Sequence, residues 1–210
     1  MMKSDPAETA APQTRREEQE LIRRVKRRDP AAMRQLIDLH KERLFAFVWR
    51  MVRNHHDAEE VCQDAFLKAF AALDTFDPTY RFSTWLFTIA YRVTLNVMRR
   101  RRGTATDIDL GLFADSGAGV EEQAVNSEEA RRLKQSVWSA VDRLSPPQRA
   151  AVLLFYQQEQ SCQDIAAVLD IPVATVKSHL HRARARLKEW LEPTWAEESN
   201  PGRIPRDLAG

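Results

Sequence analysis

Cysteine is nearly absent from this sequence. Only Cys62 and Cys162 occur among its 210 residues, which excludes a disulfide framework and a Cys-x-x-Cys zinc site. His55 and His56 stand near Cys62, but these three residues have no recognised metal-ligand spacing. Cys62 falls on the apolar side of its predicted helix, so we interpret it as a buried small hydrophobic residue. We therefore expect neither a metal nor another cofactor.

Long apolar stretches are also missing. The N-terminus lacks the apolar segment of a signal peptide, and no run of about 18 apolar residues occurs. These absences predict a cytoplasmic protein with no direct membrane insertion. Hydrophobic residues still make up 43% of the chain, which is enough for an ordinary core. Because no segment alternates apolar and polar residues as a strand does, the predicted fold class is all-α.

The usual signatures of an enzyme are missing too. No Ser/His/Asp set has a recognisable spacing, and no glycine-rich phosphate loop is present. Asp57, Glu60 and Asp64 share one predicted helix, and a single straight helix rarely surrounds a hard cation with enough oxygen ligands. We therefore expect a protein that is not an enzyme.

Positive charge is absent from one long stretch. Residues 104–129 contain no Lys or Arg, whereas the four residues 99–102 are all arginine. The net charge is only +2 although 30% of the residues are charged, so the two signs are segregated. Basic helices beside an acidic connector are typical of a nucleic-acid-binding protein.

Apolar spacing predicts helices in two groups. Asp29 and Pro30 predict a helix start, because aspartate is a good N-cap and proline fits the first helical position. Four of the six glycines lie in 103–126, which indicates a flexible acidic linker between two small helical domains. We predict a disordered N-terminus over 1–14, a first domain over 15–102, the linker over 103–126, a second domain over 127–192 and a flexible tail over 193–210. The main predicted helices are 15–28, 30–53, 57–73, 83–102, 127–144 and 148–156, with Asp57 and Ser127 as caps.

Residues 162–190 have the layout of a helix-turn-helix. Pro172 ends the first helix, because proline disfavours an α conformation at the residue before it. The second helix starts at Val173 and is strongly basic, as in motifs that enter the DNA major groove. An αα-hairpin with a basic solvated face is the alternative interpretation. Apolar residues of the second helix face inward at steps of four, three and four: Val176, Leu180, Ala183 and Leu187.

Several polar residues of this second helix are candidates for DNA contact. Ser178, His181 and Arg182 lie near its outward face, and Arg182 suits a bidentate contact with guanine. Thr175 either caps the helix or touches a phosphate. The candidate phosphate contacts are Lys177, Arg184 and Arg186.

A ridge of carboxylates follows one face of the helix predicted after Asp57. Asp57, Glu60, Asp64 and Leu67 stand at steps of three, four and three, and Gln63 flanks them. This ridge is either a solvated helix face or a docking surface for a basic helix of a protein partner, with Leu67 adding apolar area.

Aromatic and basic residues are concentrated just downstream. Aromatic faces stack on unpaired bases and arginines contact phosphates, so this region suits single-stranded or melting DNA. The alternative is that Phe82 and Trp85 belong to the core. The candidates for this contact are Phe76, Tyr80, Phe82, Ser83, Trp85, Arg92, Asn96, Arg99 and Arg100.

In this order, the motifs resemble the extracytoplasmic-function (ECF) group of bacterial sigma factors over residues 21–191. The matching segments are DAEEVCQDAFLKAF, FDPTYRFSTWLFTIAYRVTLNVMRRRR, LSPPQRAAVLLFY and the helix-turn-helix. Two positions differ from the family pattern. Arg92 stands where many members have asparagine, and His179 stands where arginine is frequent.

This resemblance implies sigma-2 and sigma-4 domains that direct RNA polymerase to promoters. It implies that the acidic ridge binds the β′ coiled coil of core RNA polymerase, with the β subunit as a further contact. It also implies that 76–100 melts and reads the −10 promoter element, that 175–186 reads the −35 element two to three helical turns away, and that an anti-sigma factor is a partner.

Overall fold

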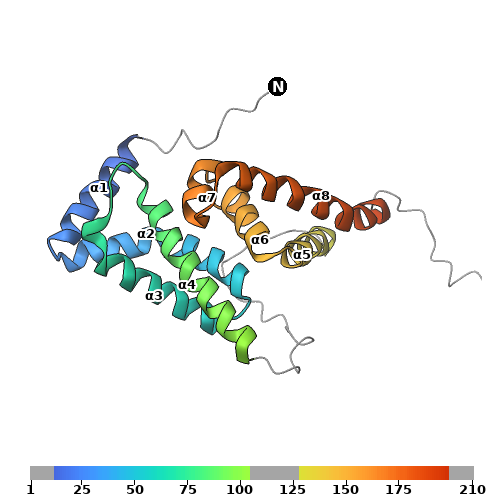
Figure 1. Cartoon of the computed structure of the whole chain (residues 1–210), viewed down its shortest axis with the longest axis horizontal. Helices are drawn as coiled ribbons and strands as arrows, with labels where there is room; N and C mark the ends of the chain where they lie inside the picture. The colour runs from blue at the N-terminus through green and yellow to red at the C-terminus, as the bar shows by residue number, and fades with distance from the viewer. Residues whose placement is uncertain (1–11, 105–127, 199–210) are drawn as a thin grey trace, which may run out of the picture.

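The computed structural model describes residues 12–104 and 128–198 (Figure 1). In these two ranges the chain forms helices and no strand, so the all-α prediction is confirmed. Residues 105–126 of the predicted linker, the cap at Ser127 and most of both predicted terminal segments lie outside the described residues. Residues 103 and 104 continue the helix that was predicted to end at 102. None of the described helices is long and apolar enough to cross a membrane.

The N-terminal half is built from four α-helices. The predicted start of the second helix is confirmed, because the Asp29 side chain accepts hydrogen bonds from the backbone N–H groups of Ala31 and Ala32 and Pro30 follows directly. Arg24 also donates to the Asp29 carboxylate, and these hydrogen bonds lower the pKa of Asp29. The elements are α1 (Pro12–Lys26), α2 (Pro30–Val52), α3 (His55–Ala71), the short η2 (Leu73–Thr75) and α4 (Phe82–Thr104).

The cap predicted for the third helix is wrong. Asn54, not Asp57, caps α3, because its side-chain oxygen accepts the backbone N–H of Asp57 at 2.9 Å. The helix therefore begins at His55, two residues earlier than predicted. Both residue types are good caps and the apolar periodicity starts only at Ala58, so the sequence pattern does not distinguish them.

The C-terminal half contains the predicted helix-turn-helix. Ser161 caps its first helix by accepting the backbone N–H of Asp164, and Asp170 ends that helix in a left-handed conformation with φ of 57°. The two helices of the helix-turn-helix are joined by the turn before Val173, as predicted. The elements of this half are α5 (Glu128–Asp142), α6 (Pro146–Val152), the π-helical turn η3 (Leu153–Gln157), α7 (Cys162–Leu169) and α8 (Val173–Glu198).

The last helix is longer than predicted. It continues to Glu198 although the flexible tail was expected from residue 193. Pro193 lacks a backbone donor and is unfavourable inside a helix by about 3 kcal/mol. The helix nevertheless continues for five residues beyond Pro193.

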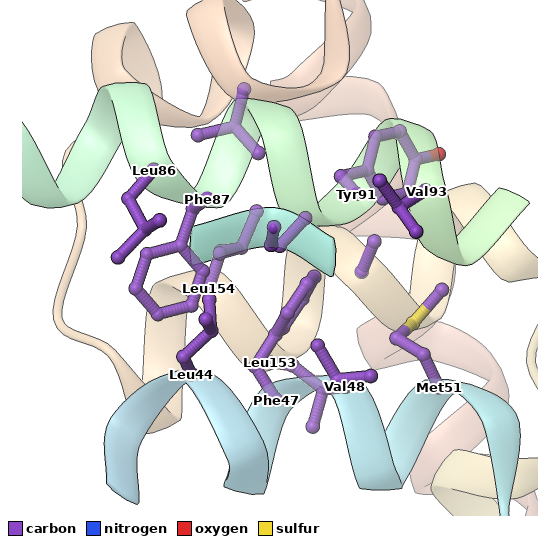
Figure 2. Packing of buried hydrophobic residues seen from close by; sticks show 14 of the residues in the cluster. Leu44, Phe47, Val48, Met51, Leu86, Phe87, Tyr91, Val93, Leu153 and Leu154 are labelled. Carbon is purple, nitrogen blue, oxygen red and sulfur yellow. The ribbon is translucent and has the colours of Figure 1, made fainter. Parts of the chain in front are cut away.

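The two halves share one hydrophobic core. Leu153 and Leu154 of η3 are buried together with Leu44 and Phe47 of α2 and Phe87 of α4. Figure 2 shows the two leucines between the side chains of α2 and those of α4. The single turn of π-helix therefore inserts its apolar residues into the N-terminal half.

Polar contacts surround this shared core. Arg43 of α2 donates to the side-chain and backbone oxygens of Gln158 at 3.0 and 2.8 Å, and Gln158 donates back to the Arg43 carbonyl at 3.3 Å. Arg53 forms an ion pair with Asp142 of α5. The Arg50 guanidinium lies 3.7 Å from the ring centre of Trp138. These contacts join the two halves around the shared core.

Replacing Leu154 by alanine tests the shared core. Leu154→Ala should lower the free energy of unfolding of the whole chain by about 2–5 kcal/mol, because the leucine is completely buried. Urea unfolding followed by circular dichroism measures this loss. Leu39→Ala is the matched control, since Leu39 is 47% exposed and should change stability by less than about 0.5 kcal/mol. Equal small effects would contradict a core shared through η3.

Candidate protein and nucleic-acid interfaces

The exposed face of α8 carries three of the predicted DNA contacts without any internal partner. Lys177, His181 and Arg182 are exposed, and none of their side chains bonds to another residue in the described part of the chain. The opposite face is anchored, because Val176, Leu180 and Ala183 are buried against α6 and α7. Ser178 is half-buried between the two faces. The helix therefore presents free donors on a rigid support.

Two other predicted phosphate contacts are held by neighbouring side chains. Arg184 Nε donates to the Tyr156 hydroxyl at 2.7 Å. Arg186 Nη1 donates to the buried Gln148 side chain at 3.2 Å. Thr175 lies within the first turn, where its backbone N–H donates to the Pro172 carbonyl at 2.9 Å. Arg184 and Arg186 are exposed and are oriented by these hydrogen bonds, which suits contacts with DNA phosphates that position the helix.

The predicted aromatic surface is divided between the core and the surface. Phe76 and Phe82 are 5% and 0% exposed, and their rings pack with Trp85 at centroid distances of 5.2 to 5.7 Å. This is the core alternative that the sequence left open, and a DNA contact by either ring stays a prediction. Trp85 is half-buried. Tyr80, in the loop before α4, is 61% exposed and available for stacking.

The polar candidates of this region follow α4. Asn96, Arg99 and Arg100 are exposed near its C-terminal end, and Arg99 donates to the Asn96 side chain at 3.3 Å. Ser83 is half-buried at the start of the helix. The candidates therefore extend along one helix from the aromatic cluster to the arginine run.

Sequence reasoning missed the contact between α7 and α4. Thr84, which is 3% exposed, donates to Asp164 of α7 at 3.1 Å. Arg92 lies 3.6 Å from Asp170 at the turn of the helix-turn-helix. One predicted −10 contact is thus paired with the domain that carries the predicted −35 contacts. No local sequence pattern predicts such a pairing, because the partners are about 80 residues apart in the chain.

The acidic ridge on α3 is partly neutralised within the molecule. Asp57 is half-buried beside Arg101 of α4, with an Oδ2 to Nη2 distance of 2.6 Å. Asp64 pairs with Lys68 at 2.9 Å. The remaining members of the ridge, Glu60, Gln63 and Leu67, are exposed, and Leu67 is 60% exposed. The structure therefore presents a mixed apolar and acidic face rather than a row of free carboxylates.

Cys62 lies next to this ridge and is half-buried. Burial, with a smaller contribution from the Glu59 carboxylate, raises the pKa of the Cys62 thiol to about 12. The thiol is therefore protonated near neutral pH and is a poor nucleophile. This environment fits the predicted hydrophobic role.

Two family models match the chain in the same order as its two halves. Sigma-70 region 2 matches residues 36–104, and Sigma-70, region 4 matches residues 134–187. The first match covers most of α2, then α3 and α4. The second covers the helix-turn-helix and the helices that support it.

Curated and solved proteins resemble the chain along most of its length. The ECF RNA polymerase sigma factor SigW of Bacillus subtilis is 31% identical over 180 residues, which are 81% of this chain and 94% of SigW. The ECF RNA polymerase sigma-E factor of Escherichia coli K12 is 34% identical, over 84% of this chain and 95% of its own.

Two solved structures are similar in fold. CnrH, solved in complex with the cytosolic domain of CnrY, has a TM-score of 0.63 and 26% identity, over 84% of this chain and 97% of CnrH. The sigma factor RpoE of Bartonella quintana, solved in complex with the anti-sigma factor NepR, has a TM-score of 0.63 and 33% identity, over 76% of this chain and 96% of its own. The chain therefore belongs to the ECF group of bacterial RNA polymerase sigma factors.

Proposed function

We propose that this sigma factor binds core RNA polymerase through the acidic ridge, reads the −35 element with α8 and reads the melted −10 element with α4 and the loop before it. The observation that carries this proposal is the unpartnered row of Lys177, His181 and Arg182 on the anchored second helix of the helix-turn-helix. The sigma factor binds its partners and carries out no chemical step. It acts in the cytoplasm, together with the polymerase.

The −35 contact divides into recognition and positioning. Arg182 is free to form a bidentate contact with guanine O6 and N7, which carries sequence information. Lys177, Arg184 and Arg186 contact phosphates, which orient the helix on any sequence. Arg184 and Arg186 donate hydrogen bonds to Tyr156 and Gln148, and these bonds orient the two arginines before DNA binds.

Arg182→Ala should lower −35 discrimination without abolishing DNA binding. The loss should be about 1–3 kcal/mol at one base position, because the bidentate contact is removed. Competition between promoter fragments for the reconstituted holoenzyme measures it. Lys177→Ala is the control, since losing a phosphate contact weakens all sequences alike and lowers the salt slope by about one. A uniform loss for Arg182→Ala would make Arg182 a phosphate contact instead.

The polymerase contact combines charge with apolar area. Glu60 and Leu67 are both exposed on α3. Asp64 lies between them in the sequence and forms an ion pair with Lys68. A basic helix of the β′ coiled coil can compete with Lys68 for the Asp64 carboxylate. Charge complementarity then speeds the encounter, and burial of Leu67 prolongs it.

Asp64→Lys should weaken binding to core polymerase by about tenfold or more, which corresponds to about 1.4 kcal/mol. The reversed charge repels the basic partner and also loses the Lys68 pair. Fluorescence anisotropy of the labelled chain against core polymerase measures the affinity. Glu17→Lys on α1 makes the same change of charge at an exposed position away from α3 and should leave the affinity unchanged. Equal affinities of the two variants would refute the ridge as the docking surface.

Engagement of both promoter elements requires the two halves to separate. Elements two to three helical turns apart are about 70–110 Å from each other along B-DNA. The two halves described above share one core, and Arg92 is paired with Asp170. We therefore propose that the compact arrangement belongs to the free chain and opens on the polymerase.

Arg43→Ala should favour the open arrangement, because the two hydrogen bonds that Arg43 donates to Gln158 are lost. The expected result is a larger radius of gyration of the free chain in small-angle X-ray scattering. Arg34→Ala on the same helix is the control, since Arg34 is exposed and has no bond to a described residue. An unchanged radius of gyration for Arg43→Ala would argue against a role for this contact in closure.

An anti-sigma factor is the further partner that we propose. The support is the Bartonella quintana relative, which was solved with the anti-sigma factor NepR.

A further inference from the structure

Helix α1 contacts the loop that carries proposed −10 residues directly through Arg15, and it reaches the same region indirectly through Glu18 and His40 of α2. This helix lies before residue 36, where the match to Sigma-70 region 2 begins, and neither Arg15 nor Glu18 has a role in the function proposed above. Figure 1 shows the loop before α4 passing beside the first part of α1. The contacts come from neighbouring positions on one helix face, three residues apart.

The first contact fixes the backbone of the loop. Arg15 Nη2 donates to the carbonyl oxygen of Thr79 at 2.8 Å, across 64 residues of sequence. The N–H of Thr79 donates to the Asp77 side chain at 2.9 Å. Both backbone polar groups of Thr79 therefore have a side-chain partner. The next residue is Tyr80, the exposed aromatic side chain of the loop.

The second contact reaches the aromatic cluster under the loop. Glu18 Oε1 lies 3.0 Å from His40 Nε2, and these side chains are only 17% and 9% exposed. The approach is close, although its direction is not that of a hydrogen bond. The His40 ring lies 5.3 Å from the ring of Phe82, which packs with Phe76 and Trp85. Glu18 thus lies against a histidine that packs on the edge of the cluster.

We propose that Arg15 and Glu18 are positioning residues for −10 recognition: they hold the loop over 76–82 in the conformation that receives unpaired bases. This inference rests on the proposed −10 role of that loop. Ordering a loop at the moment of binding reduces affinity, so a loop that is held beforehand binds more tightly. Arg15 acts on the loop backbone next to Tyr80, and Glu18 acts through His40 on Phe82.

A purely structural role of α1 is distinguishable from positioning. Ile22 and Val25, each 5% exposed, anchor α1 in the core. Arg15 is exposed, so shortening its side chain removes little buried surface. Its loss should therefore leave the folding of the first domain and the affinity for core polymerase unchanged, while −10 recognition falls.

The experiment uses holoenzyme reconstituted from core polymerase and the full chain. The probe is a fork-junction DNA with unpaired −10 bases, selected from a random pool by the wild-type holoenzyme. Arg15→Ala should lower affinity for this probe about three- to tenfold and reduce discrimination against −10 base changes. Binding of a duplex −35 fragment should stay unchanged. Arg15→Lys should restore most of the effect, because its ammonium group can donate to the same carbonyl.

Arg16→Ala is the matched control. Arg16 is exposed, lies next to Arg15 and has no bond to a described residue, so it removes the same charge without freeing the loop. Glu18→Gln should lower −10 discrimination in the same direction as Arg15→Ala. Unchanged −10 discrimination in Glu18→Gln would overturn the role of Glu18.

Three results would overturn the inference, each in its own way. If the wild-type holoenzyme selects no −10 sequence, the proposed function fails first and takes the inference with it. If the wild type discriminates and Arg15→Ala behaves as Arg16→Ala, the inference alone is wrong. If Arg15→Ala weakens −10, −35 and core binding equally, α1 has a general structural role and no positioning role.

Discussion

The insertion of Leu153 and Leu154 between α2 and α4 is the contact on which the arrangement of this sigma factor depends. Burying two leucines stabilises the packed state by roughly 3–6 kcal/mol, whereas a typical hydrogen bond adds about 0.5–1.5 kcal/mol. Because apolar burial is non-directional, the leucines stabilise the contact between the halves without fixing their orientation. The hydrogen bonds of Arg43 and Thr84 are directional and restrict that orientation. The positions of the recognition surfaces relative to one another follow from both.

Carboxylates are used twice in this molecule. Asp57 and Asp64 belong to the proposed polymerase surface and also pair with Arg101 and Lys68. Asp170 ends a helix and also neutralises Arg92. The two exposed pairs, Asp64 with Lys68 and Asp170 with Arg92, contribute at most about 1 kcal/mol each and weaken with salt. They can therefore be exchanged for contacts with polymerase or DNA at little cost, while a buried pair would resist exchange.

Local chemistry explains what could be predicted from the sequence. The Asp29–Pro30 start, the turn before Val173 and the inward residues of α8 depend on neighbours within a few positions. They were predicted correctly because capping, proline geometry and helical periodicity act at that range. The free donors of α8 follow directly, since positions between buried ones must face outward.

Long-range packing explains what could not be predicted. The sequence does not distinguish a buried Phe82 from a surface Phe82, because an aromatic residue beside arginines suits either location. Its burial results from packing against His40 of α2 and against Phe76 and Trp85. The pairing of Thr84 with Asp164 has the same character. The cap at Asn54 was missed for a different reason, since two good caps compete within one turn.

A shared core also limits how strongly the chain can respond to polymerase. If closure is favourable by a few kcal/mol, the open form is a minor population, and the apparent affinity is the intrinsic affinity multiplied by the open fraction. A nanomolar complex supplies about 12 kcal/mol, which exceeds the adhesion of two leucines and several hydrogen bonds. Polymerase can therefore open the chain, whereas −35 DNA alone, which meets an already exposed α8, need not. The compact state would then suppress −10 recognition more than −35 recognition, because Arg92 and Thr84 lie at the contact between the halves and Arg182 does not.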